Sequence, residues 1–148
     1  MGTKEKALYF VAVKILLRDG DKLFLIKDVF DDGWDLPGGR IKHDEFDTPL
    51  LDIISRKMNE EVGTEVRYEI DPTPKVYFRH RRIEAETGEP VQIFALGYEA
   101  TYRGGEPVMG DHMDRYEWVD VHTFTPETYL RGGWLKGVQE YLEHTNVR

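Results

Sequence analysis

The sequence contains no cysteine, and this absence alone excludes several kinds of site. A disulfide framework, a thiolate zinc site and a cysteine nucleophile all require that residue. Long apolar runs are absent too, since no stretch approaches the ~20 residues that a helix needs to cross a bilayer. Residues 1–6 are polar and no long apolar core follows them, so we expect no secretory signal. These absences predict a cytoplasmic protein without a membrane partner.

Positive charge is in the minority, because 28 acidic residues outnumber 20 basic ones and give a formal net charge of -8. Such a balance disfavours binding to nucleic-acid polymers, whose phosphates attract cationic surfaces. A small phosphate ligand is still compatible with it, because a divalent cation can lie between acidic side chains and phosphate. The chain is rich in apolar residues, 40% of its 148 residues, which is enough for one buried core. We predict a single domain over residues 1–148.

Strands are predicted wherever apolar residues alternate between turn signals. The predicted strands cover residues 9–18, 22–28, 76–83, 91–102 and 116–121. The first two are joined by Asp19-Gly20-Asp21, which predicts a β-hairpin. A loop rich in glycine and proline is expected over residues 31–40.

Helices are predicted in two places. Thr48-Pro49 suits the N-cap and first position of a helix, and an apolar stripe extends that helix over residues 49–62. Gly63 is placed to end it in the left-handed conformation. A second helical region begins at Thr125-Pro126 and is expected to be interrupted at Gly132-Gly133. Strands, helix, strands and helix without regular β–α–β alternation predict an α+β domain with a mixed sheet.

The residues that carry chemistry gather within residues 34–63. The run Pro37-Gly38-Gly39 predicts a loop whose backbone comes close to a ligand or ion, and loop carbonyls are ordinary ligands of hard cations. Near the end of the predicted helix, Glu60 and Glu61 share one flank with Lys57 at the edge of the apolar stripe. Two neighbouring carboxylates repel each other, and a bound divalent metal would relieve that repulsion.

These residues resemble the Nudix box, the signature of the Nudix (MutT-type) hydrolases. The family pattern is a glycine, five residues, a glutamate, seven residues, then Arg-Glu, an apolar residue, any residue, Glu-Glu, any residue and a glycine. Residues 34–39 resemble the usual lead into that box, and residues 117–120 resemble a late strand of the same fold. The resemblance spans residues 8–142. The box positions that match are Gly39, Glu45, Arg56, Met58, Glu60, Glu61 and Gly63.

The resemblance implies an α/β/α sandwich and hydrolysis of a diphosphate bond in a nucleotide-like small molecule. It implies Mg2+ or Mn2+ as cofactor, with Glu60, Glu61 and the Gly38 carbonyl as ligands. On the matched positions, Arg56 would hold the box glutamates in place and Glu45 would lie near the metal. The expected partner is that small molecule and no nucleic-acid polymer, and a homodimer is one alternative for the oligomeric state.

Three departures from the family pattern leave the activity open. Lys57 stands where the family has a glutamate, and its ammonium can neutralise the two box carboxylates without a metal. Ten residues separate Glu45 from Arg56 in place of seven, so either Glu45 or Asp47 can be the equivalent acid. His112 stands where relatives often carry a glutamate, and a histidine can act as a general base near neutral pH.

Two functions from different classes follow from these departures. The chain is either a metal-dependent hydrolase or a catalytically weak domain that binds a nucleotide or sugar nucleotide without cleaving it. Arg79 and Arg81 share one face of a predicted strand, and with Arg40 they are predicted to contact the substrate. The alternative for this basic run is an exposed strand end balanced by Glu84 and Glu86. The missing cysteine disfavours a third option, an isoprenoid diphosphate isomerase of the same fold.

Overall fold

The computed structural model describes residues 4–29 and 33–145, which form a mixed sheet between two helical layers. The strands are β1 (Phe10–Asp19), β2 (Lys22–Asp28), β3 (Trp34–Asp35), β4 (Gly38–Arg40), β5 (Arg67–Ile70), β6 (Val76–Ile83), β7 (Pro90–Gly104) and β8 (Met113–Asp120). The helices are α1 (Leu50–Val62), α2 (Pro126–Tyr129), α3 (Gly132–His144) and a 3-10 turn, His43–Glu45. No helix among the described residues is both long and apolar enough to cross a membrane.

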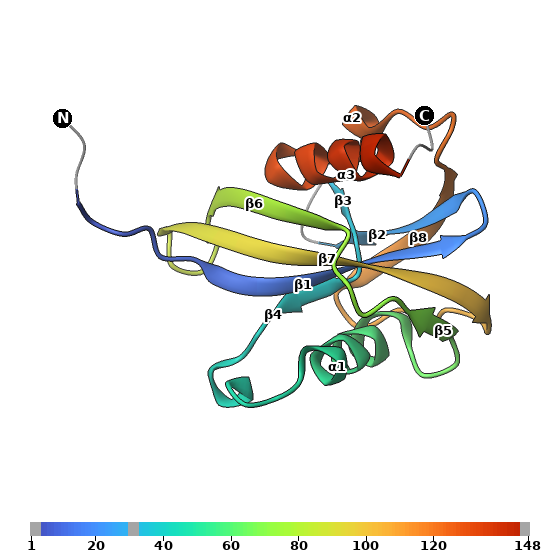
Figure 1. Cartoon of the computed structure of the whole chain (residues 1–148), viewed down its shortest axis with the longest axis horizontal. Coiled ribbons are helices and arrows are strands. Elements are labelled where there is room, and N and C mark those ends of the chain that lie inside the picture. The colour runs from blue at the N-terminus through green and yellow to red at the C-terminus, as the bar shows by residue number, and fades with distance from the viewer. Residues whose placement is uncertain (1–3, 30–32, 146–148) are drawn as a thin grey trace.

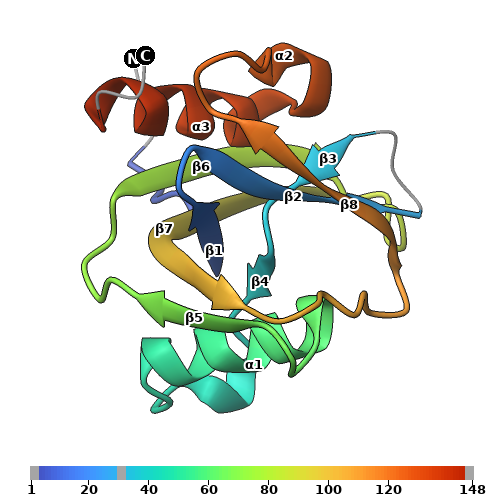
Figure 2. The same cartoon turned by 90° about the vertical axis from the view of Figure 1, so that its right-hand side faces the viewer.

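The sheet separates α1 on one face from α2 and α3 on the other, as both cartoon views show (Figure 1, Figure 2). Strands run in the order β3-β2-β1-β7-β5, with β4 on β1, β6 on β7 and β8 on β2. The long pairing of β1 with β7 is parallel and the other pairings are antiparallel. This arrangement confirms the predicted α+β class and mixed sheet.

Both faces of β1 are buried, so the chain has one apolar core on each side of the sheet. Ala12 and Leu16 belong to the core under α3, whereas Val13, Ile15 and Leu17 belong to the core over α1. From α1, the second core receives Ile53, Ile54, Met58 and Val62. Each such fully buried side chain contributes about 1.5–3 kcal/mol relative to an exposed one. The apolar stripe that predicts this helix, Leu51, Ile54, Met58 and Val62, is therefore confirmed at its last three members, whereas Leu51 is exposed and Ile53 is buried in its place.

The predicted β-hairpin is confirmed, with Gly20 at φ +57 in its turn, and β6 has the predicted bounds. The predicted first helix is also present, but its N-cap is Pro49 and not Thr48, and no side chain caps it. Gly63 follows it at φ +87, a value that favours glycine. Local sequence signals were sufficient here because each element buries a regular apolar pattern.

Other boundaries differ from the prediction. The described part of the predicted loop at residues 31–40 contains β3 and β4, whose pairing with β2 and β1 no local pattern could indicate. The second helical region breaks at Leu130-Arg131, and Gly132-Gly133 are the first residues of α3. Close approach to β6 explains the second glycine, because a Cβ on Gly133 would lie 1.9 Å from the carbonyl oxygen of Arg79.

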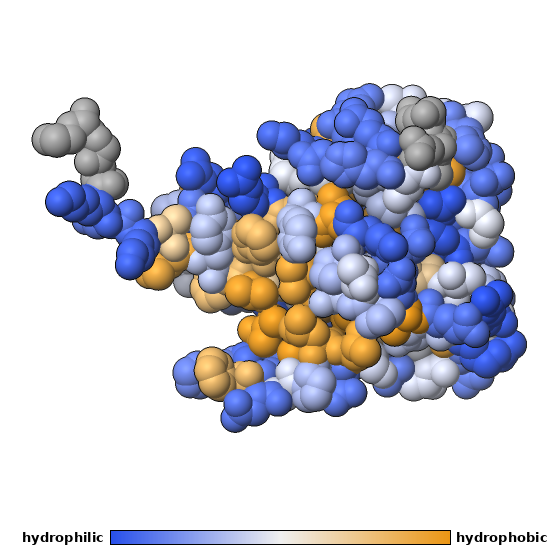
Figure 3. All heavy atoms as spheres, in the orientation of Figure 1, coloured by the Kyte–Doolittle hydropathy of each residue, from blue (hydrophilic) through white to orange (hydrophobic). Residues whose placement is uncertain are grey.

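An apolar surface is exposed between the start of β1 and the segment that leads into α1 (Figure 3). Phe10 and Val11 of β1 line a groove there with Phe46 and Leu50 on the opposite side. Phe46 is the most exposed of these, at 90%.

Candidate active site

The glycine loop and the acidic end of α1 meet, as their resemblance to a known box implies. The Gly38 N–H donates to Oε1 of Glu61 at 2.7 Å. Gly38 has φ +144, and a Cβ there would lie 2.0 Å from the carbonyl oxygen of Val13. Only glycine suits this position, because it has both an unusual φ and a backbone neighbour at close range. Burial raises the pKa of Glu61 above its ordinary value, although the bond from Gly38 opposes that shift.

Arg56 braces two of the predicted acids. Its Nε and Nη2 donate to the two carboxylate oxygens of Glu45, both at 2.7 Å, and its Nη1 donates to Oε1 of Glu60 at 2.9 Å. The side-chain hydrogen bonds from Arg56 lower the pKa of Glu45. Of the two acids left open by the sequence, Glu45 is therefore the partner of Arg56. The turn at residues 46–49, between Glu45 and the start of α1, accommodates the longer spacing.

Lys57 extends from α1 over the glycine loop. Its Nζ lies 3.3 Å from Oε2 of Glu60, and its side chain is 16% exposed. A Cβ on Gly39 would lie 2.2 Å from Cε and 2.5 Å from Nζ of Lys57. The missing side chain of Gly39 thus leaves the space through which the Lys57 ammonium reaches the loop.

A pocket of about 240 Å³ opens beside this contact, and charged side chains of both signs line it. The cations are Lys14, Arg40, Lys57 and Arg82, and the acids are Asp28, Asp35 and Glu61. Lys14 is 6% exposed, and its ammonium lies 2.9 Å from Oδ2 of Asp35 and 4.6 Å from the ring centroid of Trp134. The carboxylate and the ring face therefore hold the Lys14 side chain at a defined place in the pocket.

The arrangement does not fit a divalent cation. Within residues 4–29 and 33–145, no group of three histidine, aspartate or glutamate side chains could share a metal. One oxygen of Glu60 is bonded by Arg56 and the other faces Lys57, while Glu61 accepts from Gly38. The predicted ligand set of Glu60, Glu61 and Gly38 is therefore adjacent in the fold, but its carboxylates are engaged by donors of the chain.

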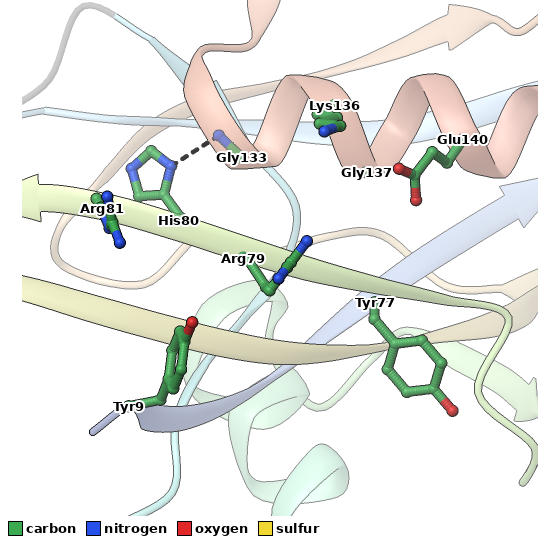
Figure 4. A pocket seen from close by; sticks show the side chains of 9 residues that line it. All are labelled: Tyr9, Tyr77, Arg79, His80, Arg81, Gly133, Lys136, Gly137 and Glu140. Atoms are coloured by element: carbon green, nitrogen blue, oxygen red, sulfur yellow. Dashed lines mark hydrogen bonds between the residues drawn. The ribbon is translucent and has the colours of Figure 1, made fainter. Parts of the chain in front are cut away.

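The predicted substrate contacts fall into two separate cavities. Arg40 lines the pocket, where its guanidinium forms two hydrogen bonds with Glu84 at 2.8 and 3.0 Å. Arg79 and Arg81 line another cavity, between β6 and α3 (Figure 4). His112, the predicted base, is not one of the residues described as lining the pocket. The structure therefore brings Arg40 to the box residues and places Arg79 and Arg81 in another cavity, while His112 directly precedes Met113, which lines the pocket.

Sequence reasoning missed Lys14, Arg82 and Trp134, all of which line the pocket. A signal existed for Lys14, since it shares a strand face with Ala12 and Leu16, both buried. A lysine between two core positions needs a specific partner. Arg82 belongs to the basic run at residues 79–82, on the face opposite to Arg79 and Arg81. Nothing local marks Trp134, because the meeting of β6, α3 and the glycine loop is set by the tertiary fold.

Known proteins resemble this chain in sequence and in fold. Residues 8–136 match the sequence profile of the NUDIX domain. The chain is 27% identical over 127 residues to mRNA-decapping enzyme subunit 2 of Saccharomyces cerevisiae, and the match covers 86% of this chain and 12% of that protein. This chain therefore spans only a small part of the length of that relative.

Two solved structures share the fold. The MutT protein from Methanosarcina mazei Go1 superposes with a TM-score of 0.71 at 18% identity, over 95% of this chain and 96% of that chain. An ADP-ribose pyrophosphatase from Streptococcus suis 89-1591 superposes with a TM-score of 0.61 at 15% identity, over 93% and 92% of the two chains. At these identities the likeness is one of architecture.

Proposed function

Because the chain belongs to the NUDIX family, we propose that its pocket binds the diphosphate of a nucleotide-like molecule. One observation carries the proposal: the cations Lys14 and Lys57 reach the same pocket from β1 and α1, next to the glycine loop. Ammonium groups are ordinary donors to phosphate oxygens, and a partly buried site strengthens that interaction.

Lys57 favours one of the two functions that the sequence leaves open. A diphosphate is strongly anionic, and a divalent cation can offset that charge. Here the chain has an ammonium where the family pattern has a glutamate, and this ammonium lies 3.3 Å from Glu60. The geometry therefore supports best a domain that binds its ligand with its own cations and cleaves it weakly or not at all.

Hydrolysis with Mg2+ or Mn2+ is the second candidate, and the hydrogen bonds that Arg56 donates to two box glutamates favour it. Arg56 holds Glu45 and Glu60, as the resemblance implies for an active box. One fold relative is named an ADP-ribose pyrophosphatase, which makes ADP-ribose the first ligand to test. The sequence relative is a decapping enzyme, which adds a cap dinucleotide to the set of ligands.

Calorimetry with ADP-ribose, nucleotide sugars, nucleoside triphosphates and a cap dinucleotide tests the proposal, in chelator and in Mg2+ or Mn2+. We expect one class to bind equally well in all three conditions, with no phosphate or nucleotide product released over hours. Binding that appears only with metal, followed by product release, would overturn the proposal in favour of the hydrolase. Absence of binding by every ligand in every condition would refute both.

A further inference from the structure

A second cavity, of about 410 Å³, lies between the edge strand β6 and helix α3 (Figure 4). Its lining includes Arg79 and Arg81 of β6 and Lys136 of α3, with Tyr9 and Tyr77 at its border. We call it the β6–α3 groove. We propose that the β6–α3 groove is a second anion site, which binds the phosphate group of a small phosphorylated molecule.

Two glycines of α3 bring the helix backbone onto β6 and so create the groove. A Cβ on Gly137 would lie 2.1 Å from Cδ1 of Phe78, and one on Gly133 would meet the Arg79 carbonyl. The Gly133 N–H donates to Nδ1 of His80 at 3.0 Å, which fixes the first turn of α3 against the strand. The wall of the groove is therefore built from close-packed regular elements, and its cations extend from rigid positions.

The cations of the groove lack acidic partners. The side chains of Arg79 and Lys136 form no hydrogen bond or ion pair with any residue in the described ranges, and the side chain of Arg81 donates only to the uncharged Gln92, at 2.9 Å. Among the described residues that line the groove, one is acidic, and it is Glu140. Three like charges facing one carboxylate are an unusual feature in a chain whose net charge is -8.

Glu84 does not balance these arginines, contrary to one prediction from the sequence. Its carboxylate lies 2.8 Å from Arg40 and 3.6 Å from Arg82, on the side of the first pocket. The hydrogen bonds from Arg40 lower the pKa of Glu84, so this carboxylate is charged and occupied by other partners. An external anion is then the natural partner of Arg79 and Arg81.

Phosphate is the anion that fits this donor set. A guanidinium presents a planar fork that matches phosphate oxygens, and two arginines with one ammonium can offset a phosphate dianion. Tyr9 and Tyr77 both contact Phe94, with ring centroids 6.0 and 5.9 Å apart, and their rings offer an apolar border to a sugar or base. We therefore expect a phosphomonoester such as a nucleoside monophosphate to bind better than inorganic phosphate.

The groove is distinct from the first pocket, although the two approach each other at Trp134. The ring of His80, which lines the groove, stacks on Trp134 at 4.7 Å, and Trp134 lines the first pocket. None of the described lysines and arginines lines both cavities. The groove can therefore bind an anion whether or not the first pocket binds a diphosphate.

Nuclear magnetic resonance of the 15N-labelled full chain tests the inference, with inorganic phosphate and adenosine monophosphate as probes. The amide signals of Gly133 and Gly137 report on the groove, and those of Gly38 and Gly39 report on the first pocket. We expect both probes to shift the groove signals, adenosine monophosphate at lower concentration. The double variant Arg79→Gln/Lys136→Gln should weaken that response by roughly tenfold or more, because charged donors are lost, and should leave the pocket signals unchanged.

The matched control is Lys22→Gln/Arg103→Gln, which removes the same charge from two exposed ion pairs outside the groove. Equal weakening in this control would overturn the inference, because net charge and not a site would explain binding. Groove signals that do not move with either probe would overturn it as well. So would citrate binding as tightly as phosphate, or a single-stranded oligonucleotide binding far more tightly than adenosine monophosphate, since each assigns the groove to another ligand class.

Discussion

The first pocket and the β6–α3 groove both collect cations, but they hold them differently. In the pocket, Lys14 lies 2.9 Å from Asp35 and Lys57 lies 3.3 Å from Glu60. In the groove, Arg79 and Lys136 have no carboxylate partner among the described residues. The pocket side chains are also mostly covered by protein, whereas the groove side chains are exposed.

The difference teaches how each site can select a ligand. Paired and covered cations are fixed before a ligand arrives, so little ordering accompanies binding and shape can be discriminated. Unpaired, exposed cations attract anions from a distance but are screened by salt. The pocket is accordingly suited to one defined diphosphate, and the groove to a phosphate group carried by several kinds of molecule.

Replacing Lys57 by glutamate should have the largest effect on ligand binding in the first pocket. The variant Lys57→Glu removes a pocket cation and groups three carboxylates on α1, so diphosphate binding in chelator should fall about a hundredfold or more. Added Mn2+ should restore it, because the new acids can share the metal. Calorimetry with and without Mn2+ measures both effects.

The neutral variant Lys57→Met is the control for Lys57→Glu. It should lose binding in chelator as well, but without rescue by Mn2+. If Lys57→Glu binds the ligand in chelator as tightly as the natural chain does, Lys57 contributes no charge to the site.

Filling the space above Gly39 with a methyl group should have the next largest effect on ligand binding. In Gly39→Ala the new methyl group would meet the flexible end of Lys57, which can swing away, so unfolding free energy should change by less than about 1 kcal/mol. Ligand binding should nevertheless fall about tenfold, because the ammonium leaves the pocket. Urea unfolding and calorimetry separate the two quantities.

A double-mutant cycle checks the cause. Gly39→Ala should add little to the binding loss already present in Lys57→Met, because both changes remove one interaction. Additive losses would mean that Gly39 matters for another reason.

A smaller effect is expected on the free energy of unfolding, which depends on the charge of Glu61 in the pocket. Burial raises the pKa of Glu61 in the folded chain above its ordinary value of 4.5, so between the two pKa values the folded state binds more protons than the unfolded state. Stability therefore declines as the pH rises above that value. Glu61→Gln keeps an acceptor for Gly38 and removes the charge, so it should be more stable than the natural chain at pH 8 but not below pH 4.

Urea unfolding at these two pH values measures the effect of Glu61→Gln. Glu61→Ala, which leaves the Gly38 N–H without its acceptor, should be less stable at both. Lower stability of Glu61→Gln at pH 8 would indicate that Lys14 and Lys57 favour the charged carboxylate more than burial opposes it.

The smallest effect is that of salt. Raising the ionic strength from about 0.05 M to about 0.5 M should weaken adenosine monophosphate binding in the groove more than diphosphate binding in the pocket, because exposed charges are screened first. Titrations at several chloride concentrations give the two slopes. Equal slopes would contradict the proposed difference in salt screening between the pocket and the groove.

The sequence was most informative where a contact lies within one element. Alternation predicted the bounds of β6, and the stripe predicted α1. The pairing of Lys57 with Glu60 follows from their spacing on a helix, and the structure contains it. Arg79 and Arg81 lie on one strand and line one cavity, which is not the cavity that Arg40 lines, and their predicted contact with the substrate stays a prediction.

What the sequence could not indicate depends on contacts between distant elements. The carboxylate of Glu84 accepts hydrogen bonds from Arg40, 44 positions away, and not from Arg79 or Arg81 of the adjoining strand. Lys14 meets Asp35 because β3 pairs with β2 and β4 pairs with β1, and Trp134 reaches Lys14 because α3 packs on β6. Periodicity describes which face a side chain occupies, but it contains no information on which other element will cover that face.

The position of Trp134 has a spectroscopic consequence. Its indole is 8% exposed and contacts the ammonium of Lys14 as well as the imidazole of His80, so a charge arriving in either cavity changes its surroundings. The other two tryptophans, Trp34 and Trp118, can be changed to phenylalanine to isolate its emission. One native fluorophore would then report occupancy of two cavities without any attached dye.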